Sequence, residues 1–154
     1  MQDSTIWFQK SPAPSTAQVN AASVNTLVAH LGIEITEVGA DFLSATMPVD
    51  TRTHQPMGLL HGGASVVLAE TLGSSAGFMC VDASKFSIVG TEINANHIRS
   101  VRSGKVTGTA RALHLGRSSQ VWEIRIENEK QQLVCISRLT VAVVAIVTQA
   151  VSSS

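Results

Sequence analysis

The sequence predicts an α+β domain in which an antiparallel sheet curls around one long helix. Only one segment, from His61 to about Cys80, is too long for an ordinary strand and has its apolar residues at helical spacing. Two runs of β-strand composition precede this segment and four follow it. The chain has 154 residues, of which 44% are hydrophobic, and this is ample for one core.

The elements predicted before the long helix are a short helix and a hairpin. The short helix is expected to end at Gly32, because apolar residues at helical spacing precede that glycine: Val24, Leu27, Val28 and Leu31. Two β-rich runs follow, 33–38 and 42–49, and the turn Gly39-Ala40-Asp41 joins them.

The long helix is apolar on nearly every side and rich in small residues, which indicates burial and a close approach by other backbone. The strands predicted after it are 87–97, 105–113, 120–127 and 133–144. Alternation is clearest in the third, where Trp122, Ile124 and Ile126 are expected to face the core. The last strand is apolar on both faces, which favours self-association.

Residues 24–147 are predicted to form the domain, with an N-terminal extension at 1–23 and a disordered tail at 148–154. The first residues do not resemble a secretory signal, and neither of the two longest apolar runs suits a membrane span. Cys80 and Cys135 lack the paired spacing of a zinc or redox motif. We therefore expect a cytoplasmic protein with two reduced cysteines.

The formal net charge is zero, with 11 basic and 11 acidic residues, and this argues against a nucleic-acid binder. Residues 93–122 nevertheless contain no acid, while the following bases fall among them: Arg99, Arg102, Lys105, Arg111 and Arg117. A small positive region suits a compact polyanion, such as the phosphates of a nucleotide-containing thioester. Solvated strand edges account for the same charges equally well.

The start of the long helix, Leu60-His61-Gly62-Gly63, is a candidate site for stabilising an oxyanion. Helix N-termini carry unsatisfied amide N–H groups and the positive end of the macrodipole. Because glycine lets a substrate approach the backbone closely, the amide of Gly62 or Gly63 is a candidate oxyanion-hole donor. The alternative is that both glycines only pack the helix entry.

Glu70 is the only acid between Asp50 and Asp82, and it interrupts an otherwise apolar helix. A carboxylate in such surroundings usually has a partner or a chemical task. Ser74 follows one turn later on the same face. Glu70 could activate a water molecule, or attack a carbonyl directly to give an anhydride. The alternative is a structural ion pair with an arginine of a neighbouring subunit.

Rival chemistries lack their motifs. The five histidines form no spaced metal cluster with acids or cysteines, so no metal site is predicted. Gly63-Ala64-Ser65 lacks the second glycine of a nucleophile elbow. The glycine-rich stretch has no lysine of a phosphate-binding loop.

Several motifs together resemble those of a known family over most of the chain, from about Gly32 to Val144. They are Met47-Pro48-Val49-Asp50, Gln55-Pro56-Met57-Gly58-Leu59-Leu60-His61-Gly62-Gly63 through Ala69-Glu70, Glu92-Ile93-Asn94-Ala95-Asn96-His97, Leu113-His114-Leu115-Gly116 and Ser137-Arg138-Leu139-Thr140. With them the chain resembles the hotdog thioesterases of the PaaI and 4-hydroxybenzoyl-CoA thioesterase type. Within that family it is most similar to the bacterial 1,4-dihydroxy-2-naphthoyl-CoA hydrolases and the enterobactin proofreading thioesterases.

The resemblance implies a role for each matching residue. Glu70 is then the nucleophile or general base, and the Gly62 amide polarises the thioester carbonyl. His61 lies beside that amide, Gln55 approaches the thioester, and Ser74 helps to position water or the departing group. Further contacts to substrate or coenzyme A are implied for Gly63, His97, Arg99, Arg102, Arg117 and Ser118.

The resemblance also implies hydrolysis of an aromatic acyl-CoA to the free acid and CoA, without a metal or redox cofactor. The family's usual assembly is a homotetramer of two dimers, in which two chains build each site. Two alternatives stay open. One is a non-catalytic acyl-CoA-binding module. The other is a hotdog dehydratase or hydratase, although the chain lacks the His-Phe-Pro-Gly opening of that family.

Overall fold

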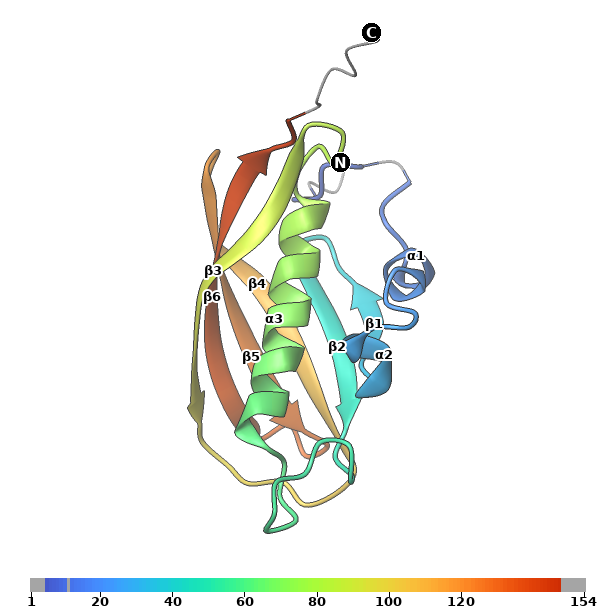
Figure 1. The fold of residues 1–154 in the computed structure, drawn as a ribbon, viewed down its shortest axis with the longest axis vertical. Helices are drawn as coiled ribbons and strands as arrows, with labels where there is room; N and C mark the ends of the chain where they lie inside the picture. Colours follow the sequence, from blue (N-terminus) through green and yellow to red (C-terminus); the bar gives the residue numbers. More distant parts are fainter. Residues whose placement is uncertain (1–4, 11, 148–154) are drawn as a thin grey trace, which may run out of the picture.

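The computed structural model describes residues 5–10 and 12–147, and these form one six-stranded sheet with a long helix against it (Figure 1). The elements in chain order are α1 (Thr16–Ala21), α2 (Leu27–His30), β1 (Glu34–Val38), β2 (Phe42–Pro48), α3 (Gly62–Met79), β3 (Phe86–His97), β4 (Lys105–Leu115), β5 (Ser119–Asn128) and β6 (Leu133–Ala145). The predicted strands and long helix are confirmed to within two residues at each end.

The strands lie in the order β1-β2-β4-β5-β6-β3, and each neighbouring pair is antiparallel. The α+β hotdog architecture is thus confirmed, with α3 lying lengthwise against one face of the sheet (Figure 1). The chain passes through α3 between β2 and β3, so β3 joins the far side of the sheet beside β6. β1 and β3 are therefore the two edge strands.

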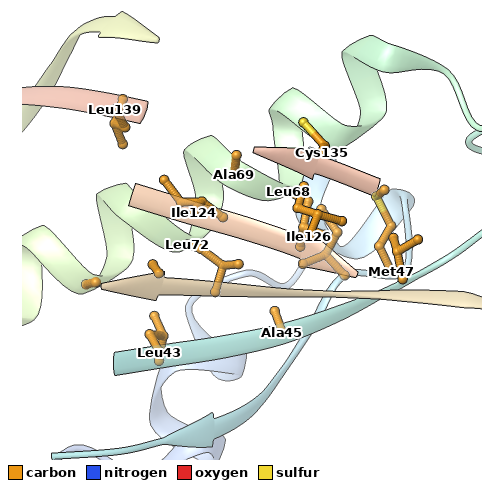
Figure 2. Close-up of a cluster of buried hydrophobic side chains, with 14 of the residues drawn as sticks. Leu43, Ala45, Met47, Leu68, Ala69, Leu72, Ile124, Ile126, Cys135 and Leu139 are labelled. Atoms are coloured by element: carbon orange, nitrogen blue, oxygen red, sulfur yellow. The ribbon is translucent and has the colours of Figure 1, made fainter. Parts of the chain in front are cut away.

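The core lies between α3 and the concave face of the sheet (Figure 2). From α3 come Leu68, Ala69 and Leu72, all fully buried. The predicted inward side chains of β5, Trp122, Ile124 and Ile126, are fully buried too. Each isoleucine or leucine in such a position contributes about 1.5–3 kcal/mol through removal of apolar surface from water.

α3 was predicted to be buried on nearly every side, but in this chain only about half of its surface is buried. The stripe that contains Ala64, Leu68, Leu72 and Ala76 packs on the sheet. The opposite stripe is partly or fully exposed, and its residues are Val66, Val67, Glu70, Thr71, Ser74, Ser75 and Phe78. This stripe mixes the apolar Val66 and Phe78 with four polar side chains, and its exposed surface is available to another surface.

The segment before β1 differs from the prediction. Thr16–Ala21 is an unpredicted helix, and its capping box joins Ser15 and Gln18. The predicted helix around Val24 shrinks to the four residues of α2, because Asn25 has a φ of 61° and interrupts the helical backbone.

The N-terminal boundary of the domain also moves. Trp7 is only 1% exposed and belongs to the core, and its indole Nε1 donates to the carbonyl of Gly39 at 2.8 Å. The amide of Phe8 donates to the carbonyl of Met79 at 2.8 Å, which ties this segment to the end of α3. Residues predicted as an extension are thus part of the domain, whereas the predicted tail at 148–154 lies outside the described residues.

Candidate active site

The first turn of α3 leaves one amide without a partner. His61 is the N-cap, and its Nδ1 accepts from the amide of Gly63 at 2.8 Å. The carbonyl of His61 accepts from the amides of Ala64 and Ser65. Within the described chain nothing accepts from the Gly62 amide. Of the two candidate oxyanion donors, Gly62 is therefore the free one.

A pocket of about 320 Å³ opens beside this amide, and we call it the Gly62 pocket. Its lining includes Gln55, Gly62, His97 and Arg99. A Cβ atom on residue 62 would lie 2.7 Å from His97 Nε2, so glycine is what admits the imidazole to the helix terminus. The structure thus brings together four of the predicted site residues, and His61 flanks them as the N-cap.

Glu70 lies near the middle of α3 and is half-buried. The hydroxyl of Ser74, one turn later, donates to Glu70 Oε1 at 2.8 Å. Hydrogen bonds to an ionised carboxylate are among the stronger ones in proteins. The carboxylate faces a second hollow of about 390 Å³ against β3, lined by Glu70, Gly90, Thr91, Glu92 and Ile93, which we call the Glu70 pocket.

The carboxylate and the free amide do not meet within one chain. Glu70 and Gly62 are eight residues apart on α3, which corresponds to about 12 Å along a helix axis. Their two pockets share no lining residue. A thioester carbonyl cannot contact both groups of the same chain, since catalytic contacts require about 3 Å.

The predicted basic contacts divide between the two ends of the sheet. Arg99 follows His97, which pairs with Cys135 at the start of β6. Arg102 lies near the same end, where its carbonyl is 2.9 Å from His54 Nε2.

Arg117 and Ser118 precede Ser119, which pairs with Ala142 near the end of β6. Because Cys135 and Ala142 are seven residues apart in one strand, about 23 Å separate these two groups of basic residues. The predicted contacts His97, Arg99, Arg102, Arg117 and Ser118 therefore do not form one patch on a single chain.

Sequence reasoning missed a third pocket. It has a volume of about 740 Å³ and lies between the N-terminal segment and the last turns of α3, and we call it the N-terminal pocket. Apolar side chains predominate in its lining and include Phe8, Val19, Phe78 and Met79. Ser75, the neighbour of Ser74, also lines it. The capping box of α1 was the one sequence signal that could have revealed this wall.

The cysteines are unsuited to nucleophilic work. Burial raises the pKa of the Cys80 thiol to about 12, and burial raises the pKa of Cys135 as well. Both are free thiols. Among residues 5–10 and 12–147, no group of three or more histidines, cysteines or acids is arranged to hold a metal ion. In the same residues, no helix has the length and apolar character needed to cross a membrane.

Comparison with known proteins identifies the family. Residues 57–135 match the thioesterase superfamily. Proofreading thioesterase EntH of Cronobacter turicensis is 60% identical over 81% of this chain and 90% of its own length. The 1,4-dihydroxy-2-naphthoyl-CoA hydrolase of Escherichia coli K12 is 54% identical over 90% of this chain and 98% of its own.

Solved structures agree with this assignment. A crystal structure of a mutant of thioesterase PA1618 from Pseudomonas aeruginosa superimposes with a TM-score of 0.89 at 51% identity, and the match covers 92% of this chain and all of that one. The resemblance read from the motifs around His61 and Glu70 is thereby confirmed. The chain belongs to the hotdog-fold thioesterase superfamily and is a thioester hydrolase.

Proposed function

We propose that the protein hydrolyses an aromatic acyl-CoA to the free acid and CoA, with Glu70 as its catalytic carboxylate. The observation that carries this proposal is the hydrogen bond from Ser74 to Glu70 Oε1, 2.8 Å long, at the edge of a pocket. It holds the carboxylate of an otherwise apolar helix in a single orientation, with one oxygen bound to the Ser74 hydroxyl. An ionised carboxylate is the state that either mechanism requires.

In the general-base mechanism, Glu70 takes a proton from water while the water oxygen attacks the thioester carbon. In the nucleophilic mechanism, Glu70 attacks that carbon itself, and water later hydrolyses the anhydride. In both, negative charge develops on the carbonyl oxygen, and the free amide of Gly62 donates to it. The carbon–sulfur bond then breaks, and the CoA thiolate takes up a proton. Neither mechanism requires a metal or redox cofactor.

We propose that two chains build each site. Glu70 and Gly62 are about 12 Å apart on one helix, so the carboxylate of one chain acts with Gly62, His61 and Gln55 of a second copy. The free edge of β3 and the half-exposed stripe of α3, which contains Val66 and Val67 beside Glu70, support such pairing, because both are surfaces that association covers. A cytoplasmic homotetramer of two such dimers is the assembly we propose.

The N-terminal pocket supports an aromatic acyl group. Ser75 in its wall is only five residues beyond Glu70 on α3, about 7.5 Å along the axis. Phe8 and Phe78 offer ring faces and Met79 offers a polarisable sulfur, which are the groups that bind aromatic rings well. One relative carries the name 1,4-dihydroxy-2-naphthoyl-CoA hydrolase, which supports an aromatic substrate for this chain as well.

The CoA portion is proposed to lie along the Gly62 pocket. His97 and Arg99 line that pocket, Gly63 lies at its helix, and Arg102 is at the same end of the sheet. Arg117 and Ser118 reach the same CoA molecule only from another subunit, because about 23 Å of sheet separates them from Arg99 in one chain.

Hydrolysis of a matched panel of thioesters tests the substrate class. Release of thiol is measured for benzoyl-CoA, hexanoyl-CoA, a benzoyl pantetheine thioester and a benzoyl carrier-protein thioester. The proposal predicts that benzoyl-CoA has the highest kcat/KM, with at least about a ten-fold preference over hexanoyl-CoA. A preference for the aliphatic ester overturns the aromatic assignment, and a preference for the carrier-protein thioester overturns the CoA assignment.

A further inference from the structure

Gly90 stands where any side chain would collide with the carboxylate of Glu70. A Cβ atom built on residue 90 lies 2.8 Å from Glu70 Oε1, 3.6 Å from its Cδ and 3.8 Å from Oε2. Real Cβ atoms essentially never approach another heavy atom within 3.0 Å. The carboxylate of Glu70 therefore occupies the space that a side chain at position 90 would fill.

Backbone conformation does not account for a glycine at this position. The glycines with positive φ in the described chain are Gly32, Gly58 and Gly104, so residue 90 has a backbone that other residues adopt. A glycine inside a strand weakens it, because the strand loses packing and the unfolded chain gains freedom. The structural reason for a glycine at position 90 is the space that it leaves for the Glu70 carboxylate.

β3 also contains an irregularity directly after Gly90. Gly90 pairs with Val141 and Glu92 pairs with Thr140, so Thr91 is the extra residue of a β-bulge. The Thr91 hydroxyl donates to the carbonyl of Thr140 at 3.0 Å and holds the bulge against β6. Bulges beside active sites commonly redirect a strand or a side chain.

We propose that Gly90 is a positioning residue for thioester hydrolysis. Its missing side chain lets Glu70 Oε1 lie between the Ser74 hydroxyl and β3, with the carboxylate exposed to the Glu70 pocket. This inference rests on the proposed role of Glu70 as base or nucleophile. The oxygen that faces Gly90 is the same Oε1 that accepts from Ser74, so a methyl group at position 90 disturbs the contact that orients the carboxylate.

The size of the disturbance sets the expected effect. Oε1 has to move by about 0.6 Å before a Cβ on residue 90 reaches an ordinary contact of 3.4 Å. Because a misplacement of 1 Å can cost about 10²-fold in rate, Gly90→Ala is expected to lower kcat at least about ten-fold. KM for benzoyl-CoA stays within about two-fold, since the residue acts on the carboxylate and not on binding.

The test is a double-mutant cycle with Glu70→Gln, measured as kcat for benzoyl-CoA. In the Glu70→Gln background, Gly90→Ala causes little further loss, because the group that it displaces is already inactive. An unchanged kcat for Gly90→Ala overturns the inference, as does a loss of equal size in both backgrounds. If Glu70→Gln alone keeps the parental kcat, the proposed function fails first and separately.

Thermal stability provides a readout that does not depend on activity. If Gly90→Ala lowers the Tm, adding Glu70→Ala is expected to restore it, because this change removes the colliding oxygen. Circular dichroism monitors both variants and the pair. A Tm loss that Glu70→Ala does not relieve shows that residue 90 matters to the strand alone and overturns the inference.

Discussion

Two inactive variants are expected to restore activity to each other when they assemble together. The change is Glu70→Gln in one copy of the chain and Gln55→Ala in the other. If each site joins Glu70 of one chain to Gln55 and Gly62 of its neighbour, a mixed dimer carries both lesions in one site and none in the other. The structure motivates this arrangement, because Glu70 and Gly62 are about 12 Å apart on α3.

The magnitude follows from symmetry. When equal amounts of the two variants pair at random, half of the dimers are mixed, and each mixed dimer has one intact site out of two. The mixture therefore recovers about one quarter of wild-type activity. Co-expression with two different affinity tags and sequential purification removes assemblies of a single variant, and in a tetramer of two randomly formed dimers about 29% of the remaining sites are intact. Thiol release from benzoyl-CoA is the assay, and each variant alone under both tags is the control.

Failure of complementation refutes the two-chain site. If the doubly purified protein is no more active than the Glu70→Gln and Gln55→Ala parents, each chain carries its whole site or Gln55 is not part of it. Mixed dimers of Gln55→Ala with the wild-type chain separate these two outcomes. They retain about half of wild-type activity if Gln55 belongs to the site, and full activity if it does not.

Two further predictions concern single side chains. Ser74→Ala removes a hydrogen bond to the Glu70 carboxylate and should lower kcat about ten-fold with KM nearly unchanged. Thr71→Ala serves as the control, because the Thr71 side chain makes no hydrogen bond to Glu70 in the described chain. An effect of Ser74→Ala on KM alone contradicts the proposed role of Ser74. Arg99→Ala should raise KM for benzoyl-CoA about ten-fold through loss of a phosphate contact, and it should leave KM for the benzoyl pantetheine thioester unchanged. Lys130→Ala in the β5–β6 turn is the control and should change KM for neither ester. Equal KM effects on both esters contradict the phosphate assignment.

The strands and α3 could be predicted because each satisfies a local rule. β5 alternates cleanly between buried Trp122, Ile124 and Ile126 and the residues between them, and the one long stretch with helical spacing begins at its N-cap His61. The segment before β1 followed no such pattern. Trp7 is buried by contacts with residues more than thirty positions away, such as Gly39. The apolar spacing around Val24 predicted a longer helix than the structure has, because the positive φ of Asn25 interrupts the helical conformation there.

The candidate site was predictable as a set of residues but not as an arrangement. Glu70 stood out as a single acid in an apolar helix, and Ser74 follows from helical periodicity. The sequence could not choose between the amides of Gly62 and Gly63, because the choice depends on where the His61 ring points. The sequence also could not show that Arg117 and Arg99 lie at opposite ends of the sheet, since the distance between them depends on strand register.

The catalytic role of Glu70 is tested by the kcat of Glu70→Gln with benzoyl-CoA, together with the affinity of this variant for that ester. Glutamine keeps the size of the side chain and can still accept from Ser74, but it can neither take a proton from water nor form an anhydride. We expect a kcat at least about a hundred-fold below that of the wild type and a retained affinity for the ester. Wild-type turnover by this variant would remove Glu70 from the mechanism.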